Sequence, residues 1–415
     1  MRGEVRIRGQ KLIFGGLKMR RLIASVLAIA FALSITACSG QSESVASTPV
    51  SASQSEVASQ SVAASLPADQ YKLTEKGTLT PETIEALAGT KLTGKTISVG
   101  TMAMPLGLPV YIAKEKGLFE KAGLDVSIDI FASGTPINEA MAAKQFDIAV
   151  SGWASAFALA TGEYTYIGDG CMSYYGQKIF GRPDAAYASD TSSGIDGVLG
   201  SAETIKNAVV LAPSNTSSHF LTLQYVKALG LETSDIEFTN MQYADAYSAF
   251  ITGNGDLIAT TNPYNQQLTD AGYVEVCDLN NILDCMIADA VYCQNDMMDK
   301  SRAADILAFM DCYYVAADML VKDPDSLWYK AGMEWYAENG YTYTDEDMLQ
   351  EIDSRTFNTY DTLCTPEHQF GYGMVVLTEF YNSVDSIEDE GVENTKNCID
   401  PSFVITLMDA HKQAT

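Results

Sequence analysis

Positive charge is scarce in this chain. Its 415 residues contain 26 Lys and Arg against 53 Asp and Glu, so the formal net charge is −27 at pH 7. Because binding to the phosphates of nucleic acid requires a basic face, we expect no nucleic-acid partner. The acidity indicates instead a well-solvated surface.

Motifs for metal binding and thiol redox chemistry are missing. The three histidines (His219, His368 and His411) lie far apart, and no Cys-x-x-Cys pair is present. Neither a zinc ribbon nor thioredoxin-like chemistry is supported, and we expect no cofactor and no metal. Cys38 is assigned below to a lipid, which leaves seven of the eight cysteines. Export would permit disulfides, but an odd number leaves at least one free thiol and fixes no pairing.

The apolar stretch near the N-terminus is too short for a confident transmembrane span. Residues 22–33 follow the basic segment 18–21 and precede Ile35-Thr36-Ala37-Cys38, which resembles the lipobox before a lipid-modified cysteine. These flanks are typical of a secretory signal. We therefore expect residues 1–38 to be a lipoprotein signal peptide, with a start at Met19 favoured over Met1. An uncleaved membrane helix is the alternative.

Residues 39–68 are rich in Ser, Ala, Gln and Val and poor in large apolar side chains. Such a composition cannot offset the entropy that folding removes, so we expect a flexible tether. A lipid on Cys38, a tether and a globular body describe a protein held on the extracytoplasmic face of the cell membrane, periplasmic or at the cell surface.

Strands and helices alternate between residues 97 and 156. The expected order is strand 97–100, helix 110–121 ending at Gly123, strand 126–130, a helix that Thr135 caps, and strand 147–150. Alternation with short connections implies a parallel sheet whose loops gather at the carboxyl ends of the strands. Ligands bind at that edge in open α/β sheets.

The stretch PVYIAKEKGLFEKAGLDVSIDIFASGTPINEAMAAKQFDIAVSG, residues 109–152, resembles the nitrate/sulfonate/taurine and thiamine-precursor group of ABC-transporter substrate-binding proteins. The resemblance extends more weakly to about residue 320. It implies a type II periplasmic-binding-protein-like α/β fold, with two lobes around a ligand cleft and hinge crossovers. A small solute, an ABC permease as partner and a monomeric state are the corresponding expectations.

A second strand–helix series follows residue 200. The expected elements are strand 209–212, helix 219–229, strand 236–238, helix 244–252 and strand 256–260. Asp256 aligns with Asp147 at a shift of 109 residues, which predicts two similar lobes, although any two α/β units share such a pattern. We expect lobe 1 to begin with residues 69–180, lobe 2 to span 181–270, and residues 271–415 to return to lobe 1 and add C-terminal helices.

Three loops of lobe 1 are expected to reach the cleft. Their candidate ligand-binding residues are Met102, Met104, Gly134, Thr135, Ser151, Gly152 and Trp153. Thioethers adapt to the shape of a ligand, the start of a helix offers free N–H groups to an anion, and an indole offers a face for stacking. Core packing by the Met and Trp side chains, and capping by Thr135, are the alternatives.

Lobe 2 supplies the densest hydroxyl cluster of the globular body. The candidates here are Ser214, Asn215, Thr216, Ser217, His219, Tyr243, Asp245, Asn262 and Tyr264. The first five resemble the family's Ser/Thr-rich loop that ends in His, with Asn215 where glycine is common. None of these loops contains Lys or Arg, so a bare anion would rely on N–H groups, hydroxyls and helix dipoles. Asp245, together with Asp169, could instead receive an amine.

The resemblance and these loops together predict a binding protein and no enzyme. We expect a lipid-anchored substrate-binding component of an ABC importer that captures a small oxyanionic or zwitterionic solute, sulfonate/taurine-like or nitrate-like. One alternative is a binder of a thiamine-pyrimidine precursor or a similar aromatic amine. Another is an enzyme on the same fold, for which His219 near Ser217 and Ser218 is the only nucleophile–base candidate.

Overall fold

A computed structural model describes residues 6–7, 10–11, 66–173, 176–283, 287–365 and 368–415. Apart from residues 6–7 and 10–11, the expected signal peptide lies outside these described residues, as do Cys38 and nearly all of the tether. The chain divides into two units, residues 1–58 and 59–415. In the first, β1 (Arg6–Ile7) pairs antiparallel with β2 (Gln10–Lys11). Everything below concerns the second unit.

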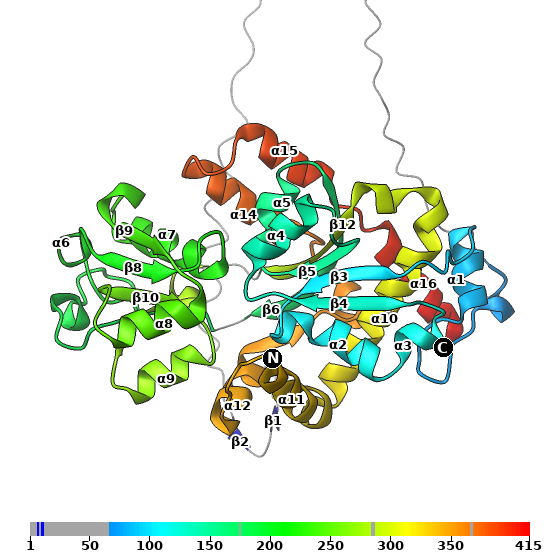
Figure 1. Cartoon of the computed structure of the whole chain (residues 1–415), viewed down its shortest axis with the longest axis horizontal. Helices are drawn as coiled ribbons and strands as arrows, with labels where there is room; N and C mark the ends of the chain where they lie inside the picture. The colour runs from blue at the N-terminus through cyan, green and yellow to red at the C-terminus, as the bar shows by residue number, and fades with distance from the viewer. Residues whose placement is uncertain (1–5, 8–9, 12–65, 174–175, 284–286, 366–367) are drawn as a thin grey trace, which may run out of the picture. The chain divides into compact units, whose positions relative to one another are not determined.

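A six-stranded sheet forms the core of lobe 1 and runs in the order β13-β6-β12-β5-β3-β4 (Figure 1). Its strands are β3 (Ile97–Thr101), β4 (Val126–Ile130), β5 (Ile148–Ser151), β6 (Tyr164–Ser173), β12 (Ala288–Gln294) and β13 (Arg355–Phe357). β4, β3 and β5 are mutually parallel, whereas β12 runs antiparallel to both β5 and β6. All four side chains of β5 are buried, as expected for a strand covered on both faces.

A five-stranded sheet forms lobe 2 and runs in the order β11-β7-β10-β8-β9. Its strands are β7 (Lys178–Gly181), β8 (Val209–Ala212), β9 (Glu237–Asn240), β10 (Leu257–Thr260) and β11 (Val274–Asp278). The sheet thus begins at Lys178 and ends at Asp278, beyond both limits of the segment 181–270. It does so because β11 pairs antiparallel with β7 along the edge and leaves the sheet only after Asp278.

The two sheets share one strand order. In lobe 1, β4, β3 and β5 are parallel; β12 then pairs antiparallel with β5, and β6 pairs antiparallel with β12. In lobe 2, β9, β8 and β10 are parallel; β7 then pairs antiparallel with β10, and β11 pairs antiparallel with β7. Ile148 and Leu257, which begin β5 and β10, lie 109 residues apart (257 − 148). The two-lobed α/β architecture predicted from the internal repeat is confirmed.

Helices cover both sheets. They are α1 (Pro81–Ala88), α2 (Leu108–Glu115), α3 (Leu118–Lys121), α4 (Gly134–Ala142), α5 (Ser155–Leu159), α6 (Ala202–Ile205), α7 (Ser217–Ala228), α8 (Tyr243–Ile251), α9 (Tyr264–Asp270), α10 (Ala303–Lys322), α11 (Ala331–Glu338), α12 (Asp345–Ser354), α13 (Tyr360–Leu363), α14 (Tyr372–Ser383), α15 (Asp389–Asn397) and α16 (Ser402–Ala414). In the described ranges, no helix combines the length and apolarity that a membrane crossing needs.

Two local predictions were wrong. Residues 110–121 do not form one helix, because Gly117 takes φ +67° and separates α2 from α3. Thr135 does not cap α4, because that helix begins at Gly134 and its N-cap is Ser133. The expected stop at Gly123 does hold, with φ +76° in the left-handed region that glycine adopts without strain.

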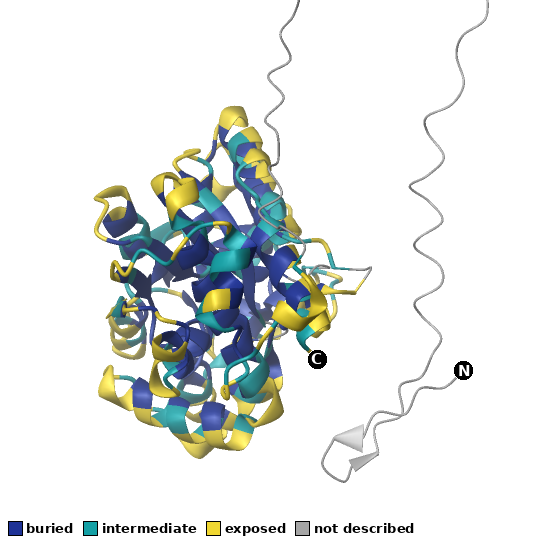
Figure 2. Cartoon of the chain, turned by 90° about the vertical axis from the view of Figure 1, so that its right-hand side faces the viewer, coloured by how far each residue is buried: buried dark blue, intermediate teal, exposed yellow. Residues whose placement is uncertain are grey.

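Helix α10 is the centre of the hydrophobic core. Fifteen of its 20 residues are buried, and the ring of Phe309 stacks on that of Phe119 with 5.6 Å between centroids. Figure 2 shows that the buried residues form a continuous interior beneath the exposed helices. The six described cysteines (Cys171, Cys277, Cys293, Cys312, Cys364 and Cys398) are all free thiols.

We expect Phe309→Ala to lower the free energy of unfolding by about 3–5 kcal/mol, because it removes a fully buried ring and leaves a cavity. Ile405→Ala, at a side chain that is 50% exposed, serves as the control and should change it by about 0.5 kcal/mol or less. Urea denaturation followed by circular dichroism measures both. Equal losses in the two variants would contradict the placement of α10 at the core.

Candidate ligand-binding cleft

A cavity of about 60 Å³ lies where the loops after the parallel strands of both lobes meet. Its lining consists of Met102, Met104, Pro105, Leu106, Ser133, Gly134, Gly152, Trp153, Ala154, Gln177, Thr216, Ser217, Tyr243, Thr261, Asp289 and Arg355. The three predicted loops of lobe 1 and the predicted segments of lobe 2 all contribute to it. Crossing contacts hold the lobes together around it, among them the edge-to-face pair of Trp153 and Phe220 at 5.4 Å.

Eight of the sixteen predicted ligand-binding residues line this cavity: Met102, Met104, Gly134, Gly152, Trp153, Thr216, Ser217 and Tyr243. They come from both lobes, as a ligand that bridges the cleft requires. Trp153 is also part of the core, since its side chain packs on Phe220 of α7.

The start of α4 forms one wall. Ser133 is the N-cap residue, yet its hydroxyl is buried, makes no capping bond and has no partner among the residues that the structure describes. Gly134 allows a close approach to the loop after β5, because a Cβ on it would lie 2.6 Å from the Cβ of Ala154. Thr135 donates a hydrogen bond across the cleft to the carbonyl of Ser214, at 3.0 Å. The first-turn N–H groups of this nine-residue helix carry the positive end of its dipole.

The start of α7 forms the facing wall. Thr216 caps this helix through its hydroxyl, and Ser217 follows as the first helical residue beside the cavity. Asn215 takes the left-handed conformation, φ +58°, which glycine or asparagine adopts readily. Its N–H donates to Nδ1 of His219 at 3.1 Å. Burial lowers the pKa of His219 to about 4, so this imidazole is neutral at pH 7 and accepts that bond.

The other eight predicted residues do not line the cavity. Those on its margin are Ser151, which is buried behind Gly134, and Thr135, Ser214, Asn215 and His219, whose bonds shape the two walls.

Three predicted residues of lobe 2 lie farther from the cavity. Asp245 is exposed on α8, and the ring of Tyr264 packs on that of Tyr247 at 5.1 Å. Asn262 is buried, and its carbonyl accepts a hydrogen bond from Tyr343 while the preceding residue, Thr261, faces the cavity.

The nucleophile–base pair considered for an enzyme is not assembled in the described residues. His219 uses Nδ1 to accept the Asn215 N–H, and the hydroxyl of Ser218 bonds to that of Tyr243 at 3.3 Å. No hydrogen bond joins His219 to the hydroxyl of Ser217 or Ser218. Within these same ranges, no group of three His, Cys, Asp or Glu side chains is placed to hold a metal.

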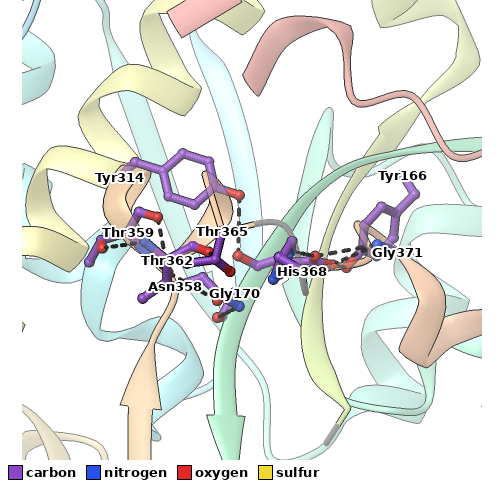
Figure 3. Close-up of polar contacts among 10 residues, drawn as sticks. Tyr166, Gly170, Tyr314, Asn358, Thr359, Thr362, Thr365, His368 and Gly371 are labelled. Atoms are coloured by element: carbon purple, nitrogen blue, oxygen red, sulfur yellow. Dashed lines mark hydrogen bonds and ion pairs between the residues drawn. The ribbon is translucent and has the colours of Figure 1, made fainter. Parts of the chain in front are cut away.

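Asp169 takes part in a separate hydrogen-bond network, drawn in Figure 3. Its carboxylate contacts Nε2 of His368 at 2.6 Å, accepts the Gly371 N–H at 3.1 Å and bonds to the hydroxyl of Tyr166. Its carbonyl accepts from Tyr314. The side chain is buried and does not line the cavity. Asp169 therefore joins β6 to the chain around α14 rather than facing a ligand.

Two charged lining residues were missed: Asp289 of β12 and Arg355, the first residue of β13. Both come from the segment that returns to lobe 1, whereas the search considered only loops after parallel strands. Arg355 is the single arginine after Arg302, which is the one sequence signal that could have drawn attention to it.

Several buried polar atoms around the cavity lack a hydrogen-bond partner within the described part of the chain: Oγ of Ser133, Oγ of Ser151, Oε1 of Gln177 and Nε of Arg355. Buried polar groups are nearly always hydrogen-bonded, because leaving one unpaired costs about 1–3 kcal/mol. Such a concentration at one cavity is what a site that awaits a polar ligand should show.

Known proteins support this architecture. A protein of Brachyspira hyodysenteriae, whose assigned name is that of an ABC transporter periplasmic binding protein, is 23% identical over 297 residues, 71% of this chain and 84% of that protein. The alkanesulfonate-binding protein SsuA of Xanthomonas axonopodis pv. citri, solved bound to MOPS, superposes with a TM-score of 0.56 at 14% identity, covering 74% of this chain and 98% of SsuA. The periplasmic nitrate-binding protein NrtA of Synechocystis PCC 6803 gives 0.55 at 12% identity, covering 77% and 91%.

These superpositions show that the chain has the periplasmic binding protein fold, as the sequence predicted. The sequence model of the NMT1-like family matches residues 90–325, more than half of the 415 residues. The chain therefore belongs to the NMT1-like family.

Proposed function

We propose that this chain is the substrate-binding component of an ABC importer and that it holds a small oxyanionic or zwitterionic solute in the cleft. The observation that carries the proposal is the cavity itself. Two lobes of matching topology enclose it, two helices point their N-termini toward it, and unpaired buried polar atoms face it.

The relatives favour this class of function. The Brachyspira protein carries the name of a transporter component, and the two structural neighbours bind a sulfonate-type ligand and nitrate, according to their names. A permease in the membrane is then the protein partner, and this protein acts on the extracytoplasmic side of the membrane.

The cavity is much smaller than the roughly 300–1,000 Å³ of typical ligand pockets, so a ligand larger than a few atoms enters only if the lobes separate. That motion must break contacts between the lobes, and the apolar ones include the packing of Phe220 on Trp153. The polar ones include the Thr135–Ser214 bond, the bond from Arg355 to Thr261 and that from Tyr343 to Asn262. Hinge closure on the solute, as in two-lobed binding proteins generally, is the proposed mechanism.

We expect Ser217→Ala to weaken binding about tenfold or more, because its hydroxyl would bond an ionic ligand group, while the melting temperature changes little. Thr216→Ala is the matched control at the adjacent position. Since Thr216 caps α7, its loss should cost about 1 kcal/mol of stability. Calorimetry with the best ligand from a thermal-shift screen of sulfonates, nitrate, amino acids and vitamin precursors measures both quantities. Unchanged affinity in Ser217→Ala would remove this residue from the site.

Closure makes a second prediction. Small-angle scattering should show a smaller radius of gyration when that ligand is saturating than when it is absent, because the open form separates the lobes. Identical scattering curves would contradict the hinge mechanism.

The proposed lipid anchor leads to a third prediction. In a bacterial host, Cys38→Ala should move the protein from the membrane fraction into the soluble extracytoplasmic fraction, because the thiol that carries the lipid is gone. Cys364→Ala, which removes an exposed thiol of the globular body, is the control. Membrane retention of Cys38→Ala at the wild-type level would disprove the anchor.

A further inference from the structure

Two charged side chains line the cavity, and one of them has no partner. The carboxylate of Asp289 lies against Gly152, 3.6 Å from where a Cβ on that glycine would sit. It makes no hydrogen bond or ion pair with any residue in the described part of the chain. An isolated carboxylate inside a protein is costly unless something pairs with it.

The other charge, Arg355, is largely balanced by the protein. Its Nη1 lies 3.7 Å from Oε2 of Glu351, and its Nη2 donates to Thr261 at 2.9 Å. Glu351 is fully buried and accepts hydrogen bonds from Trp328, Tyr336 and Tyr343. Burial raises the pKa of Glu351, while Arg355 and these three donors act to lower it. Arg355 therefore has an ionic partner within the protein.

Arg355 is thus shared with Glu351, whereas the carboxyl of Asp289 has no hydrogen-bond or ion-pair partner among the described residues. Groups for an anion are also present at the cavity: Nε of Arg355, which has no hydrogen-bond partner among the described residues, and the first turns of α4 and α7. The cavity thus offers donors to an acidic group and an acceptor to a basic one.

We propose that Asp289 determines specificity by pairing with an ammonium group, so that the solute is a small zwitterion whose acidic end is held by Arg355 and the two helix starts. This inference rests on the proposed binding function and narrows its ligand class. A bare anion would meet the unpaired carboxylate of Asp289 at short range, and like charges in a desolvated site repel strongly.

The change in protonation of Asp289 on binding distinguishes a zwitterion from a bare anion. Burial raises the pKa of Asp289 to about 7, against a smaller lowering by Arg355, so the carboxyl is part protonated at pH 7. An ammonium group beside it stabilises the carboxylate and releases protons on binding. A bare anion stabilises the neutral acid and takes protons up.

The described groups that interact electrostatically with Asp289 keep one protonation state between pH 5 and 9. Burial raises the pKa of the Cys171 thiol and of the Tyr313 hydroxyl well above their usual values. Arg355 stays charged, with a raised pKa. Burial also raises the pKa of Glu351, the partner of Arg355, so the comparison with Asp289→Asn is what assigns proton exchange near pH 7 to Asp289.

Isosteric ligand pairs test the proposal. Taurine is compared with 1-propanesulfonate, and β-alanine with butyrate, because each pair exchanges an ammonium for a methyl group and neither member titrates near pH 7. Titration calorimetry at pH 7, in two buffers of different ionisation enthalpy, gives the affinity and the number of protons exchanged. In at least one pair, we expect the amine to bind tenfold or more tightly than its partner and to release protons.

Asp289→Asn should abolish this preference and the proton release, while Asp245→Asn, which alters an exposed carboxylate outside the cavity, should leave both as in the wild type. Thermal melting at pH 5 and pH 9 checks folding. The wild type should lose more stability toward pH 9 than Asp289→Asn, because a carboxyl with a raised pKa destabilises the folded state when it ionises. If Asp289→Asn does not fold, the affinity ratio within each ligand pair, measured on the wild type together with its proton count, decides.

Tighter binding of an amine-free member, with proton uptake, would overturn the role of Asp289 and leave the proposed binding function intact. If Asp289→Asn binds the amine member of a pair as tightly as the wild type does, the role of Asp289 would also be overturned. Binding of neither member of either pair would reject the small-zwitterion class and, for solutes of this size, the proposed function with it.

Discussion

The pairing of β12 with both β5 and β6 is the constraint on which this fold depends. After lobe 2 is complete, the chain returns to the first sheet through β12. This strand inserts between β5 and β6, which precede it by more than 100 residues, and it runs antiparallel to both. All its residues but Asp289 are buried. Since this strand completes lobe 1 and also carries Asp289 into the cleft, the same ladder that stabilises the sheet sets the position of a charged group at the candidate site.

A second consequence concerns energy. Unpaired polar atoms of Ser133, Gln177 and Arg355 sit beside the cavity, each at a cost that a folded protein normally avoids. The rest of the chain offsets that cost through a large apolar interior, in which α10 contributes the central helix. Conflicts between local satisfaction and global stability are expected at functional sites, and several of those in the described residues lie at this cavity.

The local sequence pattern was sufficient to predict much of the fold. Strands β4 and β8 have the bounds that alternation and β-branched residues predicted, and the repeat at 109 residues corresponds to one shared strand order. The break at Gly117 was missed because an isolated glycine in an apolar helical pattern does not by itself signal a left-handed residue. Arg355 was missed for a different reason. Its partner Thr261 is 94 residues away in the other lobe, and no periodicity encodes such a contact.

The charge of the whole chain fits a ligand of low net charge. With a formal charge of −27, the surrounding potential opposes the approach of a bare anion, most strongly at low ionic strength, while a zwitterion feels almost no net force at long range. At short range a zwitterion would gain from both ends, because Asp289 and the starts of α4 and α7 all contribute to the cavity lining. Specificity of this kind comes from opposed charges in a small desolvated space, where each ionic bond is worth more than in water and a ligand that lacks one end leaves a buried group unpaired.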